Sequence, residues 1–392
     1  MHKYFGIPFF LFTIWLVFQA TFKFSAPLTI WIQTFFSFLS FQLGNFLTSH
    51  GVSKWFVSLF TEGIIGGVGG VLVFVPSIAI LFFLISVLED TGYMSRVAFI
   101  MDRLMHKLGL HGKAFIPLII GFGCNVPGVM ATRTLETKQE RLLTILMSPF
   151  ISCSARLPVY VLFVGIFFTK HQGIIIASLY TLSIVVTILM GLLFKKLFSK
   201  GLSTELLIEL PPYRWPTLKN LLLHIWEKVG AFIKKAGSII LAFSVIIWLL
   251  ASLPIGVPYA SLESLAGTIG QTIAPVFVPL GFDNWQSGVA LTFGLVAKEV
   301  IVSTFATLHG ATGAVTDSDL LSLALRQYFT PLSAYSFLVF VLLYSPCVAT
   351  LAVIKKETGS YKWVLFVIAN TLLVAYITAL IIYQGGKLIG LN

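Results

Sequence analysis

Long apolar stretches alternate with short polar ones along the whole chain. Seven of them have about the 20 residues that a helix needs to cross a bilayer; they fall near 7–26, 63–88, 142–168, 173–194, 230–253, 334–354 and 361–384. Two more apolar stretches, 114–131 and 287–308, are interrupted by glycine, proline or charged residues. The pattern predicts an all-α, polytopic membrane protein with about seven full transmembrane helices and two broken or re-entrant segments.

The first broken segment centres on residues 121–128, which read GFGCNVPG. Pro127 removes a backbone donor, and the glycines around it weaken a helix. In a bilayer such backbone survives only where it is buried in protein or lines a polar cavity. Because interrupted helices mark substrate sites in transporters, we interpret 114–131 as half of a transport site. The alternative is a Gly/Pro kink that serves only helix packing.

Composition and charge support a membrane protein and argue against a nucleic-acid partner. The chain is 57% hydrophobic and 10% charged, whereas a soluble domain carries about 25% charged residues. Its net charge of +11 comes from basic residues in short clusters between the apolar stretches, as inside-facing loops require. The first apolar stretch lacks a small-residue cleavage site, so we expect it to be kept as a span.

The distribution of Lys and Arg predicts the orientation. Most of them lie in loops 89–115, 132–141, 195–235 and 355–362, which should be cytoplasmic. Segments 254–286 and 309–333 carry one basic residue, Arg326, and should face outside. With a cytoplasmic N-terminus the full spans alternate correctly if both broken segments re-enter without crossing. The aromatic stretch 30–58 is mildly amphipathic and is expected to lie at the membrane interface.

An internal repeat predicts the domain organisation. The order span, connector, broken segment, span, span occurs twice, with Gly109 matching Gly281, Gly121 matching Gly294, and 153–157 matching 347–351. The predicted regions are 1–58 (first transmembrane helix and interfacial segment), 59–198 (first repeat), 199–229 (basic cytoplasmic linker) and 230–392 (second repeat). Because the two halves should run in opposite directions, this is the inverted-repeat plan of secondary transporters, with binding near the midplane.

The three cysteines, Cys124, Cys153 and Cys347, all lie in apolar segments beside proline. They show no CxxC spacing, which argues against both a disulfide framework and a zinc knuckle. Thiolate is a soft ligand that suits late first-row metals. Together with Asn125, which follows Cys124, the cysteines are candidate metal ligands. The alternative is that each is a small buried hydrophobe.

Charged residues in the apolar segments are further candidate site residues. An ionisable group at membrane depth costs free energy, so its presence there points to a function. Glu299 is the preferred hard ligand or proton-coupled group, and Lys298 is its counter-ion or extends away. Arg156 pairs with Glu299 or caps a cavity; the alternative is an ion pair that only orients two helices. Four histidines are expected in loops without ligand spacing, namely His106, His111, His171 and His309. No phosphate-loop motif occurs, so we expect no enzyme and no nucleotide bound by this chain alone.

Residues 88–160, which include GFGCNVPG and SCSARLP, closely resemble the membrane domain of the bacterial ferrous iron transport protein B family. Stretches 6–22, 63–78, 295–304 and 344–353 are similar to that family too. The resemblance implies a multi-pass importer of the cell inner membrane with two gate repeats. It also implies that Cys124, Cys153 and Cys347 handle Fe²⁺, which is the transported substrate and not a permanently bound cofactor.

One feature of that family is missing from this sequence. Its members carry a GTP-binding domain before the first span, and this chain starts at Met1 almost directly in that span. A separate GTP-binding protein, a truncated chain and transport without GTP are all open, as are a small cytoplasmic accessory protein and a homo-oligomer. The competing reading is a gate-repeat protein of the nucleoside-recognition or spore-maturation type without metal transport. A nucleoside carrier is a third, for which the sequence shows no polar aromatic pocket.

Overall fold

The computed structural model describes residues 3–198, 238–254, 261–308 and 317–390, with a few single positions between 221 and 233. Every secondary-structure element in these residues is a helix. Six helical segments among them are long and apolar enough to cross a membrane, or seven if a bent pair counts as one span. They are Pro8–Ser49, Trp55–Asp90, Lys138–Phe167, Gln172–Phe198, Pro331–Thr358, Tyr361–Leu388 and the pair Leu265–Leu280 with Trp285–Phe293, bent by 105°. The predicted all-α, multi-pass membrane protein is confirmed.

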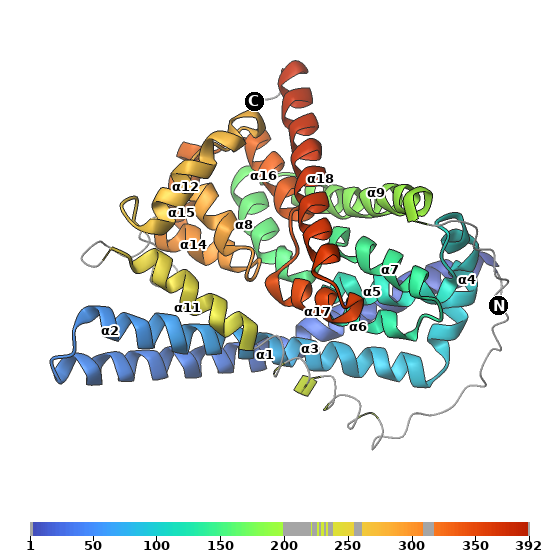
Figure 1. Cartoon of the computed structure of the whole chain (residues 1–392), viewed down its shortest axis with the longest axis horizontal. Coiled ribbons are helices and arrows are strands. Elements are labelled where there is room, and N and C mark those ends of the chain that lie inside the picture. Colours follow the sequence, from blue (N-terminus) through green and yellow to red (C-terminus); the bar gives the residue numbers. More distant parts are fainter. Residues whose placement is uncertain are drawn as a thin grey trace. The chain divides into compact units, whose positions relative to one another are not determined.

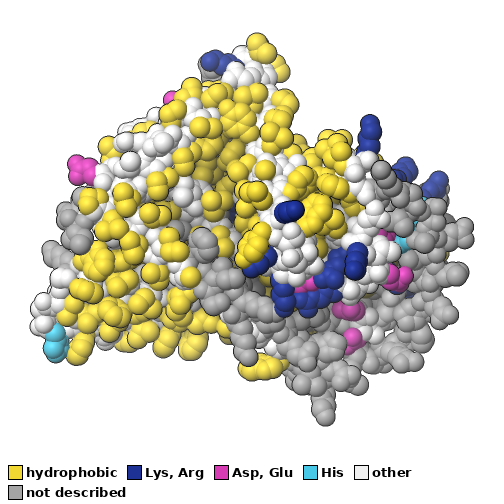
Figure 2. Space-filling model, in the orientation of Figure 1, with side chains coloured by type: hydrophobic (Ala, Val, Ile, Leu, Met, Phe, Trp, Pro, Cys, Tyr) yellow, Lys and Arg dark blue, Asp and Glu magenta, His cyan; other side chains and the backbone are white. Residues whose placement is uncertain are grey.

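The surface of the described residues is suited to lipid. Large hydrophobic side chains are exposed along the outer helices, among them Trp31, Phe41 and Leu365, each about two-thirds exposed. Figure 2 shows hydrophobic side chains covering much of the visible described surface, while Lys and Arg gather in a few places. A water-soluble protein rarely exposes contiguous apolar area on this scale, so the solvent for these faces is the bilayer.

The chain folds as two compact units, Met1–Ser148 with Ile188–Val245, and Pro149–Thr187 with Ile246–Asn392. In the first unit, helix α1 (Lys3–Ser49) is followed by a turn, α2 (Lys54–Ser58), the π-helical η1 (Leu59–Ile65) and α3 (Gly66–Asp90). Helices α1 and α3 lie side by side (Figure 1).

Helix α1 continues from the predicted first span at 7–26 into the predicted interfacial segment at 30–58 and ends at Ser49. The location of 30–58 at the membrane interface stays a prediction. Pro27 lies inside α1 and removes only one backbone donor, a loss that a helix packed against a neighbour tolerates. Each compact unit consists of two separate stretches of the chain, whereas the predicted regions are continuous in sequence. The predicted boundaries at 58, 198 and 229 stay a prediction. Nearly all of the predicted linker 199–229 lies outside the described residues.

Helix α4 (Tyr93–Lys107) is amphipathic and buries one apolar face. Its buried residues recur every three or four positions; they are Met94, Val97, Ala98, Met101 and Met105. Val97 and Met101 pack with Phe10 of α1 and Ile119 of the following helix. The chain then continues through η2 (Gly112–Ala114), α5 (Phe115–Gly123), α6 (Asn125–Ala131), η3 (Thr132–Thr134) and α7 (Lys138–Met147). Helix α4 therefore anchors the first broken segment against α1.

The second unit is built around a buried helix, α16 (Pro331–Leu343). Phe337 of α16 stacks on Phe163 with ring centroids 5.0 Å apart, and Phe305 and Phe329 pack edge-on around them. The other elements that lie wholly in this unit are η5 (Ser154–Arg156), α8 (Leu157–Phe167), α12 (Leu265–Ile273), η7 (Ala274–Leu280), α13 (Trp285–Phe293), α14 (Val300–Leu308), α15 (Asp317–Tyr328), α17 (Val348–Thr358) and α18 (Tyr361–Leu388). Helices α9 (Gln172–Phe198) and α11 (Ser238–Ser252) are divided between the two units. Helix α18 lies alongside α16 (Figure 1).

Two local features recur in both predicted repeats. Gly109 and Gly281, which the sequence pairs, both have left-handed backbone, with φ of 74° and 84°. Each comes directly before a broken segment, and in each half a cysteine precedes an 11-residue helix, α8 or α17. A repeat of this local geometry supports the predicted register. The opposed direction of the halves in a membrane stays a prediction.

Candidate functional site

The first broken segment breaks at Cys124, inside the stretch where the sequence predicts it. Cys124 has extended backbone (φ −153°, ψ 130°) between α5 and α6. Its N–H donates to the carbonyl of Ile120 and its own carbonyl accepts from Gly128. Pro127 lies in the first turn of α6, where its missing N–H would have no helical partner in any case. The break therefore lies at Cys124, and Pro127 is in the first turn of the second short helix, α6.

Helices α5 and α6 pack against each other closely. A Cβ added to Gly128 would lie 3.0 Å from the carbonyl oxygen of Pro117 and 3.1 Å from the Cα of Gly121. With nine and seven residues, the two helices are about 13 Å and about 10 Å long, so neither alone spans an apolar layer of about 30 Å. Their close contact across Cys124 is the geometry of a re-entrant segment.

The second broken segment is interrupted at residues 294–299, between α13 and α14. This confirms the predicted break in 287–308. The turn is held by hydrogen bonds within it and by one from outside, in which the N–H of Val348 donates to the carbonyl of Leu295 over 2.9 Å. Residue Val348 begins α17, so the turn lies directly against the chain around Cys347.

Two further interruptions were missed by the sequence analysis, which treated 142–168 and 334–354 as unbroken spans. The first separates α7 from α8 around Cys153, and the second separates α16 from α17 at residues 344–347. Pro149 and Pro346, each following a serine, supply a physical reason, because proline cannot donate to the helical ladder. That signal was present in the sequence but was weighed below the length of the apolar stretch.

All three cysteines occupy the same structural position. Cys124, Cys153 and Cys347 each have extended backbone and each directly precede a helix, α6, η5 or α17. None makes a side-chain capping bond to its helix, and all three are partly exposed and outside any disulfide. Each thiol therefore lies at a backbone break, where the preceding helix leaves its last carbonyls without helical partners.

The two buried cations hold the breaks in the second unit together. The Nζ of Lys298 donates to the carbonyl of Ser345 over 2.7 Å and lies 3.1 Å from the centre of the Tyr344 ring. Arg156, fully buried, donates to the carbonyls of Ile151 and Pro149. The expected ion pairs of Lys298 or Arg156 with Glu299 are not found in the part of the chain that the structure describes. Carbonyls at the breaks accept hydrogen bonds from these cations and take the place of the water that would otherwise solvate them.

The two predicted ligands with oxygen donors, Asn125 and Glu299, each have one buried side-chain oxygen that makes no hydrogen bond to a described residue. Within the described residues, Oδ1 of Asn125 and Oε2 of Glu299 are buried and have no hydrogen-bond partner. A buried oxygen without a partner costs roughly 1–3 kcal/mol, and such groups in native structures usually serve a ligand, an ion or water. Both oxygens lie at breaks, Asn125 next to Cys124 and Glu299 in the 294–299 turn.

The structure brings some of the predicted site residues together. In the second unit Cys153, Cys347 and Glu299 all lie within electrostatic range of Lys298, as does Arg156. Cys124 and Asn125 belong to the first unit. The predicted ligands therefore form two groups, each with sulfur and oxygen donors at interrupted helices.

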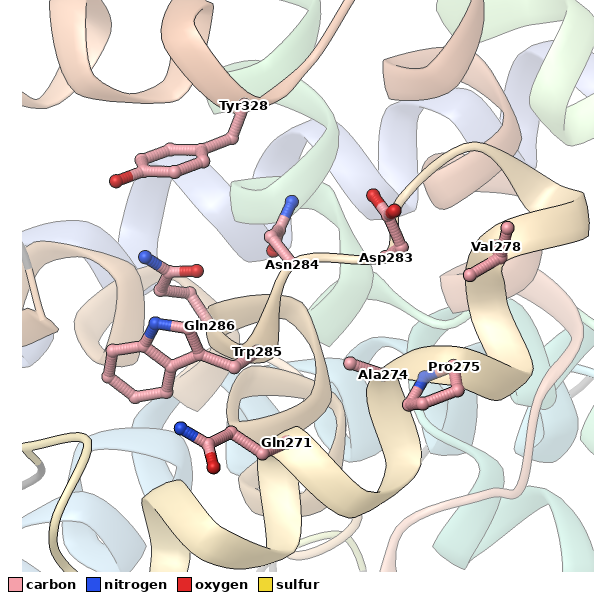
Figure 3. A pocket seen from close by; sticks show the side chains of 9 residues that line it. All are labelled: Gln271, Ala274, Pro275, Val278, Asp283, Asn284, Trp285, Gln286 and Tyr328. Carbon is pink, nitrogen blue, oxygen red and sulfur yellow. The ribbon is translucent and has the colours of Figure 1, made fainter.

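A pocket of about 480 Å³ lies elsewhere in the second unit (Figure 3). Its lining comes from α12, η7, α13, α15 and the turn before α13, and comprises Gln271, Ala274, Pro275, Val278, Asp283, Asn284, Trp285, Gln286 and Tyr328. None of the five predicted metal ligands is among them. The pocket is open and mixed in character, so the interrupted helices remain the better candidate site.

Comparisons with known proteins agree with this geometry. A family model named Gate, described as nucleoside recognition, matches residues 71–167 and 233–361. A second model, described as the ferrous iron transport protein B C terminus, matches residues 176–228. The Gate match covers every one of the interruptions described above, because it includes Cys124, Cys153, the 294–299 turn and Cys347.

Individual relatives are similar over nearly the whole chain. A Staphylococcus aureus (strain COL) protein named Fe(2+) transporter FeoB is 47% identical over 390 residues, which are 99% of this chain and 58% of that protein. A protein of the same name from Methanocaldococcus jannaschii is 45% identical over 98% of this chain and 56% of its own length. A Porphyromonas gingivalis Fe(2+) transport protein A/Fe(2+) transporter FeoB fusion protein is 39% identical over 99% and 51%. The chain spans a little over half the length of these relatives, and no solved structure matches it.

Proposed function

The chain belongs to the Gate family of membrane proteins, and we propose that it forms the membrane path of an Fe²⁺ uptake transporter. The observation that carries this proposal is the shared position of the three thiols. Each lies at an interruption of an apolar helix, with a partnerless buried oxygen of Asn125 or Glu299 at the same or a neighbouring break. Relatives named Fe(2+) transporter, similar over nearly the whole chain, support the choice of ion.

The donor set suits Fe²⁺ for a physical reason. Sulfur favours iron over magnesium and calcium, which prefer oxygen ligands alone. The carboxylate of Glu299 supplies the negative charge that lets a divalent ion leave water in an apolar surrounding. Free backbone carbonyls at the ends of half-helices add weak oxygen ligands, as in other transporters with broken helices. A site that combines thiols, one carboxylate and weakly binding carbonyls should bind the ion weakly enough to release it.

Residues that touch no metal also have a part in this proposal. Lys298 and Arg156 hold the breaks beside Cys347 and Cys153 by hydrogen bonds to carbonyls. They thereby fix the direction in which each thiol points, and they keep their own charges compensated. In this proposal they are positioning residues.

Energy and partners come from outside the described helices. A GTP-binding domain on another polypeptide or on another part of the protein would drive or gate uptake, and this chain itself would catalyse no hydrolysis. The P. gingivalis relative, whose name joins an Fe(2+) transport protein A to the transporter, supports a small accessory protein as partner. The cell inner membrane, a cytoplasmic N-terminus and a homo-oligomeric assembly belong to the same proposal.

The competing function, a gate-repeat protein without metal transport, is less well supported. The matching family model carries a nucleoside-recognition description, but the relatives are named Fe(2+) transporters. The pocket of Figure 3 is lined by one tryptophan and one tyrosine, and nothing about it singles out a nucleobase.

The test is Fe²⁺ flux into liposomes that contain the purified chain and an iron-sensitive dye. The wild-type chain should carry Fe²⁺ faster than empty liposomes. The triple variant Cys124→Ser, Cys153→Ser and Cys347→Ser should carry less and should discriminate less well against Mn²⁺, because serine keeps the size but loses the soft donor. Glu299→Gln should reduce the flux of all divalent ions alike.

The matched control is Glu263→Gln, which removes an exposed carboxylate next to α12 and should leave the flux unchanged. Variants must be incorporated in equal amounts. If the triple-serine variant carries Fe²⁺ like the wild type, the thiols serve only packing. If the wild-type chain is no faster than empty liposomes even when a GTP-binding domain is supplied, the transport proposal fails.

A further inference from the structure

A third group of side chains that could hold a metal lies in the first unit, at the turn that leads into the first broken segment. Asp102, His106 and His111 each offer one possible ligand atom, and these three atoms lie within 4.8 Å of one another. The expectation that His106 lies in a loop is wrong, because His106 is in the last turn of α4, whereas His111 does lie in a loop. His171 does lie in a loop, and His309 falls outside the described residues.

The local backbone explains how the group forms. Asp102 and His106 are four residues apart on α4 and so share one face of it. Helix α4 ends at Lys107, and Gly109, with left-handed backbone (φ 74°), turns the chain back. His111 then meets His106 with ring centroids 5.8 Å apart. Only this turn brings the third residue to the face that the first two share.

Carboxylates hold the returning segment in place. Oδ1 of Asp102 accepts the N–H of Gly112 over 2.7 Å, which leaves Oδ2 as the oxygen for a metal. Oε1 of Glu140 accepts the N–H of His111 over 3.0 Å and lies 3.4 Å from Nε2 of its ring. Glu140 is itself buried and receives a hydrogen bond from Thr137 on its other oxygen.

This arrangement is typical of histidines that bind metals. A metal-ligating imidazole usually has its second nitrogen turned to a carboxylate, which fixes the ring and makes it a stronger donor. Glu140 is such a carboxylate, because its Oε1 lies 3.4 Å from Nε2 of His111. Glu140 thus has a reason to be buried that goes beyond capping the backbone of His111.

We propose that Asp102, His106 and His111 bind a divalent first-row transition metal, with water in the remaining positions. Two imidazoles and one carboxylate with open positions are a ligand set that suits Fe²⁺. Ligands of one ion stand about 2.1 Å from it, and thus closer together than 4.8 Å. His106 closes the difference by turning, which its exposure allows. The site is open to solvent, so the ion exchanges readily.

The identity of the ion as Fe²⁺ rests on the proposed transport function, whereas binding of a transition metal does not. Loop 89–115 is predicted to be cytoplasmic, so the site would receive Fe²⁺ on the side where imported ions arrive. It would hold the ion until a soluble acceptor takes it. Its ligands are nitrogen and oxygen only, which separates it from the thiol sites in any spectroscopic test.

The probe is Co²⁺, an air-stable substitute for Fe²⁺, titrated into the purified full chain that carries the three Cys→Ser substitutions. Equilibrium dialysis with metal analysis should give one Co²⁺ per chain, with a visible spectrum free of thiolate charge transfer. His106→Gln should weaken this binding by about 10-fold or more, on the scale of changes around metal ligands. Because His106 is exposed, its replacement should leave the fold intact.

The matched control is His50→Gln, which removes another exposed histidine of the first unit, just after α1. It should bind Co²⁺ like the parent. If His106→Gln also binds like the parent, or if bound Co²⁺ disappears with the cysteines, the proposal is wrong. Loss of Co²⁺ binding in His106→Gln supports the site whether or not the wild-type chain carries Fe²⁺ into liposomes. The two proposals can therefore fail separately.

Discussion

Replacing Gly128 by alanine tests whether the close contact of α5 and α6 shapes the first broken segment. The new Cβ would lie 3.0 Å from the carbonyl oxygen of Pro117 and 3.1 Å from two backbone atoms of Gly121. These neighbours belong to the backbone of α5 and cannot turn away as a side chain would. The two helices must separate by a few tenths of an ångström, which displaces Cys124 between them.

The magnitude follows from two opposed effects. Overpacking of this kind typically costs about 1–3 kcal/mol, while replacing glycine in a helix by alanine returns about 0.5–1 kcal/mol. The net expectation is a destabilisation of up to about 2.5 kcal/mol. For a cooperative unit of roughly 200 residues this lowers the unfolding temperature by up to about 10 °C.

The assay is thermal unfolding in detergent together with Fe²⁺ flux into liposomes. Gly165→Ala in α8 is the matched control, because its Cβ would have nothing within 4 Å, so this variant should be as stable as the wild type or slightly more. Gly128→Ala should lower both the unfolding temperature and the flux. If Gly128→Ala behaves like Gly165→Ala in both measurements, α5 and α6 do not pack as closely as described.

Three further variants test other parts of the structure. Lys298→Met removes the charged hydrogen bond to the Ser345 carbonyl and should cost about 1–3 kcal/mol in thermal unfolding experiments. Glu136→Gln removes the partner of Lys113, whose charge and hydrogen bond hold the pKa of Glu136 below its ordinary 4.5. The stabilisation by this pair is therefore present above pH 4.5 and lost as the pH falls through the lowered pKa. Glu263→Cys in the cysteine-free chain should react with a membrane-impermeant reagent from outside intact cells.

Each of these three variants has its own control or its own result that would contradict the prediction. Lys170→Met removes an exposed lysine and should leave the unfolding temperature unchanged; an equal effect of both would show that Lys298 does not hold the break. For Glu136→Gln, unfolding is compared with the wild type at pH 7 and at successively lower pH, and a difference that does not shrink as the pH falls below 4.5 would contradict the linkage. Labelling at position 263 only after permeabilisation would overturn the predicted topology.

The sequence alone determined the class of protein and the places of two of its helix breaks. Apolar stretches of spanning length, a low charge content and clustered basic loops are properties of the composition in each window, so they need no knowledge of contacts. The break at GFGCNVPG and the break near Lys298 could be located for the same reason, because glycine and proline act on the backbone locally. The candidate ligands Cys124, Cys153, Cys347, Asn125 and Glu299 followed from residue type and depth.

Only the tertiary structure decided how those residues are arranged. The breaks around Cys153 and at 344–347 persist because Arg156 and Lys298, distant from some of their partners in sequence, satisfy the carbonyls that each break exposes. The sequence left open whether these residues pair with Glu299, extend away or cap a cavity, because their carbonyl partners cannot be identified from residue type. The group of Asp102, His106 and His111 likewise depends on a left-handed turn at Gly109. Hydrogen bonds to carbonyls and the direction of a turn depend on where the backbone lies, and a hydrophobic pattern does not record that.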